Sequence, residues 1–413
     1  MQYLINQKKI HYSWIIAFTG LFVLLSCLGL ARFAIGMLLP SMGISLDLSY
    51  SQMGLIGTGN FIGYMVAVLG SSYLTKRIGA RQTITIGLSF VGISMIFIGC
   101  AIGFLDIFVL YFITGVGSAL ANVSMMGSVS HWFSKKNSGI AAGIMMAGNG
   151  FAIAFVGIIV PLINNLYGDE GWRTSWFIMG IISIIITIFA FVLLRNTPKD
   201  IGLSPLGSDI ETLLENDDET RCKKKDRKTI FHLGIIFLLF GTTYAVYATF
   251  IVTELVSVRG FDEKVAGNIW AIIGMLSIIS APLFGWISDK LGRKIAMIIV
   301  YSLFTICYLL VAFDLSNAYL FLSIGIFGLT VWSIPTIVTA TISDYFGPKH
   351  AGQVLAYVIL FFSLGQIFGP MIAGFIADSN GSFKMAFGIC GALTFLAIFV
   401  SYFLNPPIQK QKS

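Results

Sequence analysis

The chain contains twelve long apolar segments, and this pattern restricts its fold more than any other feature of the sequence. A helix needs about 20 mostly apolar residues to cross the hydrocarbon core of a bilayer. Only 11% of the 413 residues are charged, far fewer than in a water-soluble protein of this size. We predict membrane-spanning helices at residues 14–39, 51–74, 82–103, 107–130, 138–163, 174–195, 230–257, 265–288, 295–313, 318–342, 351–377 and 384–405.

Lysine and arginine are distributed unevenly between the two sets of predicted loops. With a cytoplasmic N-terminus, 21 of the 26 basic residues fall in cytoplasmic loops or tails, 4 fall outside and Arg32 lies within a span. Such an excess of positive charge in short cytoplasmic loops is the usual topology signal of membrane proteins. The sequence therefore predicts cytoplasmic N- and C-termini, and it accounts for the net charge of +7 without a nucleic-acid partner.

The sequence also repeats itself at an offset of 213 residues. The matching pairs are Gly54 and Gly267, Gly79 and Gly292, Gly115 and Gly328, Ser130 and Ser343, Phe133 and Phe346, and Gly139 and Gly352. One gapless offset serves four regions, which indicates two six-helix halves related by an axis along the membrane normal. We predict halves at 1–195 and 230–413, joined by a largely unstructured cytoplasmic linker at 196–229. A short amphipathic helix at Ile210–Leu214 is compatible with the composition of this linker.

The loop after the eighth span carries a recognisable motif. It reads GWISDKLGRK from Gly285 to Lys294, in which the glycines permit a tight turn and Asp289 can accept hydrogen bonds from helix-end amides. Together with twelve spans, this loop resembles the signature loop of the major facilitator superfamily, which implies a gating role for Asp289 and Arg293. The matching loop after the second span has Lys76 where the family usually has aspartate. This departure weakens the gating lock that the resemblance implies there.

Four further segments resemble particular subgroups of this superfamily. The sequences GIAAGIMMAGNG (139–150), GWR (171–173) and LRNTPKDIGLSPLG (194–207) are similar to bacterial relatives of the monocarboxylate porters and oxalate/formate antiporters. The sequence LARFAIGMLLPSM (30–42) resembles an uncharacterised bacterial subfamily of the same superfamily. In the first of these segments, the small residues at positions 139, 143 and 147 are four apart, which predicts close helix packing.

The monocarboxylate-porter resemblance implies particular substrate-binding residues. Those porters carry a lysine in the first span that binds the substrate carboxylate, and Arg32 matches its place. Their tyrosine in the second span matches Tyr64, and their asparagine in the fourth span matches Asn122. Their aspartate–arginine pair in the eighth span, which serves proton coupling, has no counterpart here because residues 265–288 contain no charge.

Arg32 also stands out on physical grounds. A charged side chain deep in a span costs at least ~2.5–3.5 kcal/mol, so the protein interior must use it. Gly29 and Gly36 share its helical face and leave room for a ligand or for another backbone. A planar guanidinium can bind a carboxylate through two parallel hydrogen bonds. The alternative is that backbone carbonyls or a buried acid satisfy Arg32, and the candidate acid is Glu254 in the seventh span.

Glu254 has two interpretations of its own, as an acid wetted at the membrane interface or as a proton carrier for coupling. Three aromatic residues lie in spans that line the cavity in this superfamily, namely Tyr244, Tyr247 and Trp332. We predict that they form the apolar wall of a binding pocket. The alternative for each is ordinary packing or contact with lipid.

These observations predict an all-α, twelve-helix secondary transporter in a bacterial cytoplasmic membrane, and not an enzyme. Its substrate would be a small organic anion, most simply a monocarboxylate, moved by alternating access through a monomer. No nucleotide-binding loop or metal-ligand spacing is present, so we expect no cofactor. Proton coupling remains open. The main alternative is an efflux carrier for drugs or metabolites, although drug/proton antiporters of the superfamily carry arginine where this chain has Tyr111.

Overall fold

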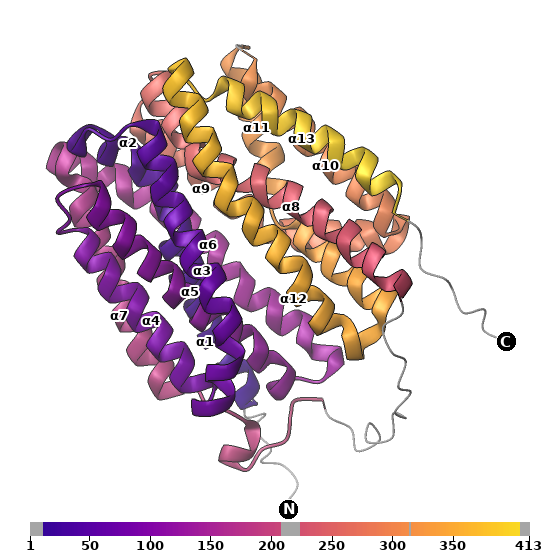
Figure 1. Cartoon of the computed structure of the whole chain (residues 1–413). Helices are drawn as coiled ribbons and strands as arrows, with labels where there is room; N and C mark the ends of the chain where they lie inside the picture. Colours follow the sequence, from indigo (N-terminus) through magenta and orange to yellow (C-terminus); the bar gives the residue numbers. More distant parts are fainter. Residues whose placement is uncertain (1–10, 208–223, 314, 405–413) are drawn as a thin grey trace, which may run out of the picture.

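The computed structural model describes residues 11–207, 224–313 and 315–404. Within these ranges, twelve helical segments are long and apolar enough to cross a membrane, which confirms the prediction of a twelve-helix membrane protein. The chain forms two groups of helices that lie beside each other, one drawn in indigo to magenta and the other in red to yellow (Figure 1).

The first half consists of α1 (Tyr12–Leu24), η1 (Leu25–Phe33), α2 (Ala34–Leu46), α3 (Tyr50–Ile78), α4 (Ala80–Ile98), α5 (Phe104–Trp132), α6 (Lys135–Tyr167), η2 (Gly168–Glu170) and α7 (Gly171–Leu193). α1, η1 and α2 are continuous and together make the first span. This span runs to Leu46, past Pro40, and ends where Asp47 adopts a left-handed conformation (φ 51°). It is therefore longer than the predicted 14–39.

The second half consists of α8 (Lys224–Thr253), η5 (Glu254–Val258), α9 (Glu263–Leu291), α10 (Arg293–Ala312), α11 (Asn317–Thr330), α12 (Ser333–Asn380) and α13 (Lys384–Tyr402). The long α12 contains parts of two spans, because Gly347 (φ 72°, ψ 167°) breaks the helix between them. A positive φ of this size suits glycine, which has no Cβ to clash.

Residues 196–207, at the start of the predicted linker, have defined structure. They include η3 (Pro198–Ile201), and Leu206 pairs with the end of α5. The Leu206 N–H donates to the Trp132 carbonyl (3.0 Å), and the Ser134 N–H donates to the Leu206 carbonyl (3.0 Å). The helix α8 begins inside the predicted linker, and the helix suggested at Ile210–Leu214 lies outside the described residues.

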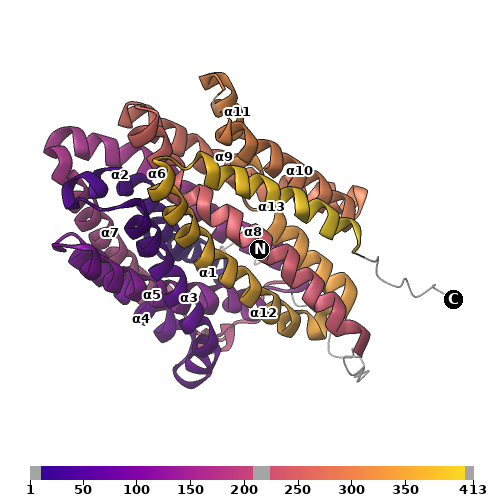
Figure 2. The same ribbon diagram turned by 45° about the horizontal axis from the view of Figure 1, so that its top comes forward.

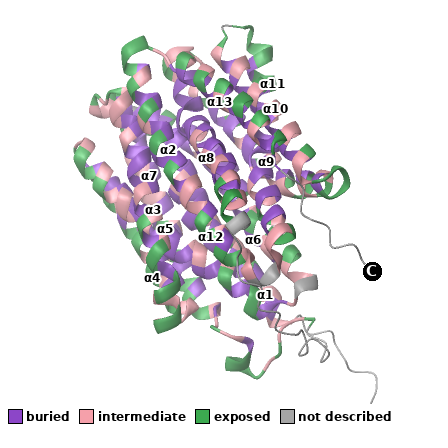
Figure 3. Ribbon diagram, turned by 45° about the vertical axis from the view of Figure 1, so that its right-hand side comes forward, coloured by how far each residue is buried: buried purple, intermediate pink, exposed green. Residues whose placement is uncertain are grey.

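Burial follows the arrangement expected for a membrane bundle. Buried residues gather along the middle of the molecule and exposed ones along its outside (Figure 3). Many exposed side chains are large and apolar, for example Leu69, Ile188 and Phe375, which are 69%, 60% and 52% exposed. Such an apolar exterior suits lipid, because apolar groups there do not face water.

The two ends of the bundle differ in how closely the halves approach each other. We call the end that carries residues 196–207 and the turns at Gly79 and Gly292 the linker end, and the opposite end the far end. Toward the far end, α3 packs against α12 and α6 packs against α9, and α3 and α12 lie side by side in both views of the ribbon (Figures 1 and 2).

Several hydrogen bonds join the halves on this side. The Asp378 carboxylate accepts from the backbone N–H groups of Tyr50 (2.7 Å) and Ser51 (3.0 Å), at the start of α3. Thr58 donates to the carbonyl of Ile367 (2.9 Å). These contacts hold the two halves together at the far end in the conformation seen here.

Gly157 of α6 and Gly267 of α9 mark a close backbone contact between the halves. A Cβ atom added to either glycine would overlap the carbonyl oxygen of the other. At the linker end of α6 the situation is the reverse, because a Cβ added to Gly139 or Gly143 would meet nothing within 4 Å. The close packing predicted for this stripe of small residues is therefore wrong at Gly139 and Gly143 in this conformation.

We expect Gly267→Ala to open the far end. The added methyl group would meet a backbone oxygen that cannot rotate away, at a cost of about 1–3 kcal/mol. Spin labels at positions 165 and 268, on a background without native cysteines, should show a longer distance distribution in this variant. Gly285→Ala in the same helix is the control, because its added Cβ would meet only a Thr336 methyl at an ordinary 3.6 Å. Unchanged distances in Gly267→Ala would contradict the assignment of this contact as the closure.

Candidate substrate-binding site

The first span changes its winding next to Arg32. α-Helix gives way at Leu25 to the π-helix η1, which ends at Phe33, and Arg32 lies in its last turn. π-Helical turns are rare, and they occur often at functional sites. Because each such turn contains an extra residue, η1 rotates the side chains that follow relative to those that precede it.

The Arg32 side chain lies on aromatic rings of α3. Its guanidinium carbon is 4.4 Å from the ring centre of Tyr64 and 5.1 Å from that of Phe61. Asn122 of α5 donates from Nδ2 to the Tyr64 hydroxyl (2.7 Å). The structure thus brings together Arg32, Tyr64 and Asn122, which the sequence proposed as a group. Tyr111 adds a contact that the sequence did not indicate, because its hydroxyl donates to the Arg32 carbonyl (3.2 Å).

Several polar atoms in this group lack partners. Within the described part of the chain, Nε and Nη2 of Arg32 are buried and have no hydrogen-bond partner. The same holds for the amide oxygens of Asn60 and Asn122. An unsatisfied buried polar group costs about 1–3 kcal/mol, and more when it is charged. The site therefore presents unused donors on a cation beside two unused acceptors.

Aromatic residues of the second half meet the first half beside Arg32. The ring of Phe33 lies 6.2 Å from that of Tyr244 and 5.8 Å from that of Trp332, and these two rings are 6.1 Å apart. Tyr247 lies elsewhere. It stacks on Phe327 at 3.9 Å in the core of the second half. The structure thus places Tyr244 and Trp332, but not Tyr247, next to the arginine site.

A small cavity lies between the halves at this level. Its volume is about 10 Å³, which is about the room that one water molecule needs. Its lining includes Arg32, Asn60, Tyr111, Tyr244 and Thr249. No organic molecule fits this volume in the conformation seen here.

The two glycines beside Arg32 serve helix packing. Gly29 lies against Ala152 of α6, and Gly36 lies against the carbonyl of Ala248 and the ring of Trp270. Of the two options that the sequence left open, room for a ligand or for another backbone, the structure therefore shows the second. The contact at Gly36 also closes the site toward the far end.

Glu254 is fully buried and lies at the far end. It accepts from Nε of Arg259 (3.1 Å) and from the backbone N–H of Phe383 (3.2 Å). Arg259 lies five residues later, which is the spacing of the π-helix η5. Both the solvent-wetted interpretation of Glu254 and its direct pairing with Arg32 are wrong in this structure. The arginine site has no carboxylate partner within the ranges that the structure describes.

Asp289 and Arg293 lie at the linker end, within the second half. Arg293 pairs through Nη1 with Asp289 (2.5 Å) and through Nε with Asp344 (2.7 Å). This network ties together α9, α10 and α12, whose linker ends it holds. The sequence did not single out Asp344, although the 213-residue offset would have compared it with His131.

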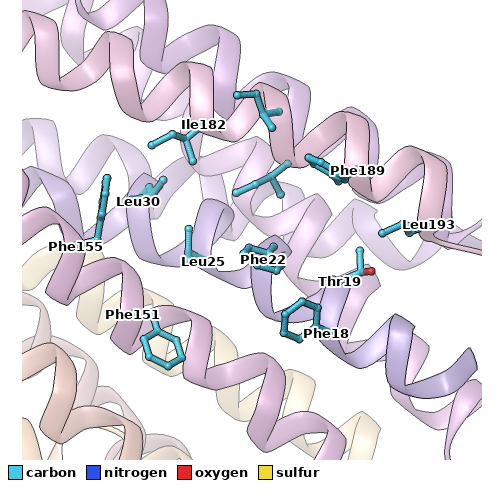
Figure 4. A pocket seen from close by; sticks show the side chains of 12 residues that line it. Phe18, Thr19, Phe22, Leu25, Leu30, Phe151, Phe155, Ile182, Phe189 and Leu193 are labelled. Carbon is cyan, nitrogen blue, oxygen red and sulfur yellow. The ribbon is translucent and has the colours of Figure 1, made fainter. Parts of the chain in front are cut away.

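A larger apolar groove lies elsewhere in the first half. It has a volume of about 700 Å³ and opens between α1, η1, α6 and α7. Figure 4 shows aromatic and aliphatic side chains from these helices lining it, among them Phe22, Leu30, Phe155 and Phe189. Its one polar lining residue, Thr19, already donates to the Ile15 carbonyl (2.8 Å). The groove does not include Arg32.

Together, the twelve spans in two packed halves and the partly buried Arg32 where the halves meet define a multi-pass membrane transporter. The family model of the Major Facilitator Superfamily matches residues 21–313 and 233–413. The chain belongs to this superfamily, whose members are transporters and not enzymes.

Several transporters are similar to this chain along most of its length. The hexuronate transporter of Bacillus subtilis is 24% identical over 395 residues, which cover 92% of each chain. The probable sulfoacetate transporter of Cupriavidus necator is 21% identical and covers 91% of this chain and 90% of its own. Monocarboxylate transporter 11 of Mus musculus is 22% identical, with 94% and 86% covered.

Solved structures share the fold. A bacterial homologue of the human lysosomal transporter Spinster, in an inward-facing and occupied conformation, superposes with a TM-score of 0.74 at 13% identity. The alignment covers 96% of this chain and 97% of that one. The nucleoside transporter NupG superposes with a TM-score of 0.72 at 14% identity, over 96% and 99% of the two chains. At these identities the likeness concerns the fold alone.

Proposed function

We propose that this protein moves a small organic anion across the membrane by alternating access, with Arg32 as the residue that binds the anionic group. The observation that carries this proposal is the guanidinium of Arg32, whose Nε and Nη2 are buried and have no partner in the described part of the chain. Three of the relatives are hexuronate, sulfoacetate and monocarboxylate transporters, whose names all denote anionic substrates.

The neighbouring amide groups of Asn60 and Asn122 restrict the chemical class of the substrate further. The unused oxygens of Asn60 and Asn122 accept hydrogen bonds, and a carboxylate has none to donate. A hydroxyl group on the substrate would satisfy them. A hydroxylated carboxylate therefore fits the site better than an unsubstituted monocarboxylate does. Tyr64, Tyr244 and Trp332 would supply the apolar and aromatic surface around it.

The distribution of basic residues also predicts how the protein is oriented in the membrane. The linker end carries most of the basic residues, so it faces the cytoplasm by the positive-inside rule, with both termini on that side. The conformation seen here is then open to the cytoplasm and closed outside. Two features would serve the conformational cycle, the contact network of Asp289 and Arg293 at the linker end and the buried Glu254 at the far end. The setting is a bacterial cytoplasmic membrane, the unit is a monomer, and the coupling ion remains open.

Uptake into proteoliposomes tests this function. Vesicles that contain the purified protein should accumulate or exchange a radiolabelled hydroxylated carboxylate, such as a hexuronate, faster than protein-free vesicles do. An excess of unlabelled sugar acid should compete, and an uncharged sugar of the same size should not. Binding without flux would indicate a sensor, and no response to any anion would refute the proposal.

One observation favours a second candidate function, the efflux of apolar compounds. The 700 Å³ groove faces outward among membrane-spanning helices, so a lipophilic compound could enter it directly from the bilayer. In that case uncharged lipophilic compounds, and not carboxylates, should stabilise the purified protein. Phe155→Ala, which shortens the wall of the groove, should weaken that stabilisation.

A further inference from the structure

The two halves differ at the linker end, where their repeated sequences should make them alike. In the second half, Arg293 bridges two carboxylates and thereby holds three helix ends together. The offset of 213 residues carries Asp289, Arg293 and Asp344 onto Lys76, Ala80 and His131. The first half has therefore lost both carboxylates and the arginine that fills the space between them.

A pocket of about 510 Å³ occupies this place in the first half. It lies among the linker ends of α3 and α5, the start of α4, and residues that follow α7. The lining combines two nitrogen bases with several hydroxyl groups, from Lys76, His131, Ser72, Thr75, Ser128 and Thr197. The loss of the arginine side chain at Ala80 accounts for the room, and the loss of the carboxylates accounts for the charge.

The pocket carries positive charge that no carboxylate in its lining neutralises. No lining residue carries a carboxylate. Lys76 is exposed and has neither an ion pair nor a hydrogen bond to any residue that the structure describes. The acid linked most directly to the lining is Asp200, and both of its oxygens accept hydrogen bonds from Thr197. These bonds hold the pKa of Asp200 below its ordinary value, so its charge is already engaged.

We propose that this pocket binds a phosphate group. A phosphate offers several acceptor oxygens at once, which matches the Lys76 ammonium, the His131 imidazole and the Ser72 hydroxyl better than a flat carboxylate does. The hydroxyls of Ser128 and Thr197 already donate within the protein and would line the pocket without donating to the phosphate. The pocket also lies at the ends of membrane-spanning helices, the level at which lipid headgroups are found. A bound phosphate would replace the missing carboxylates and join α3, α4 and α5 as Arg293 and its partners join α9, α10 and α12. The proposal is independent of the Arg32 site.

Two phosphate sources share this chemistry, a free phosphate and the headgroup of an anionic phospholipid. The test is thermal unfolding of the full chain in phosphate-free detergent, with inorganic phosphate or with dioctanoyl phosphatidylglycerol, each compared with chloride at equal ionic strength. Ligand that binds only the folded state raises the apparent Tm. We expect a rise on the order of 3 °C near saturation. A response to phosphate identifies the free anion as a ligand, and a response to the lipid alone identifies the headgroup.

Four variants test whether the rise in Tm comes from this pocket. Lys76→Gln should lose most of the rise, and Lys76→Asp with Ala80→Arg, which introduces the counterparts of Asp289 and Arg293, should abolish it in a folded protein. Lys290→Gln removes a lysine from the matching loop of the second half and should keep the full rise. Arg32→Ala should keep it too, so failure of this proposal can be told from failure of the proposed transport function. A rise that survives Lys76→Gln, or that is lost in Arg32→Ala, would overturn the proposal, as would no rise at all.

Discussion

Replacing Arg32 with alanine should abolish carboxylate binding and leave the helical content of the protein unchanged. The guanidinium has two buried nitrogens without partners in the described structure, and hydrogen bonds to charged groups contribute about 1.5–3 kcal/mol each. The expected loss of affinity is therefore about 100-fold or more. The measurement is ligand-induced thermal stabilisation in detergent, with circular dichroism to follow the fold. Arg32→Lys should lie between wild type and alanine, because it keeps the charge and loses the planar fork.

Arg81→Ala provides the matched control for this experiment. Arg81 also lies over an aromatic ring, with its guanidinium carbon 4.3 Å from the ring centre of Phe191, but it sits at the linker end and lines neither cavity. Equal stabilisation by carboxylates in wild type and Arg32→Ala would remove Arg32 from the binding site. Aggregation of Arg32→Ala, with Arg81→Ala well behaved, would instead show that the charge serves the fold.

Glu254→Ala should lower the free energy of unfolding by about 3–5 kcal/mol, because it leaves a largely buried arginine without its carboxylate. The pair is well enclosed, since the side chains of Glu254 and Arg259 are 0% and 10% exposed. The carboxylate also accepts from the Phe383 N–H, so a second donor would lose its partner. Chemical or thermal unfolding in detergent, followed by tryptophan fluorescence, measures the effect.

A double-variant cycle separates the ion pair from other roles of Glu254. Glu254→Ala combined with Arg259→Met should be less damaging than the sum of the two single changes, since no unpaired charge then remains buried. A different outcome would support the proton-carrier interpretation. In that case Glu254→Ala would unfold like wild type and would lose only the dependence of transport on a proton gradient.

The sequence predicted the number of spans because a bilayer imposes one simple length and polarity requirement on each helix. It predicted much less about side-chain direction, for the same reason. In an apolar span, residues that face lipid, the core and a cavity have similar polarity. Tyr244 and Tyr247 therefore looked equivalent, yet one contacts Phe33 and the other stacks inside the second half.

The grouping of Arg32, Tyr64 and Asn122 came from resemblance to a family and not from periodicity. The π-helix η1 had no sequence signal, because its winding depends on how the first span packs against α5 and α6. Phe61, Asn60 and Tyr111 were missed for this reason, since only the winding of the span determines what Arg32 meets. Arg259, the partner of Glu254, was missed because it lies at a π-helical spacing, and Asp344, the second partner of Arg293, was missed because it is distant in the sequence.

The unpacked glycines of α6, Gly139 and Gly143, affect the relative free energies of the conformations of the protein. Gly150 and Gly157 are pressed against α9, but Gly139 and Gly143 touch nothing on the face where a Cβ would point. A helix in a membrane loses backbone stability at each glycine unless close packing compensates it. We expect the compensation to come in the opposite state, when the linker end closes on this second pair. α6 would then have one pair of glycines for close packing in each of the two conformations. The two conformations would stay close enough in free energy for substrate binding to shift the equilibrium between them.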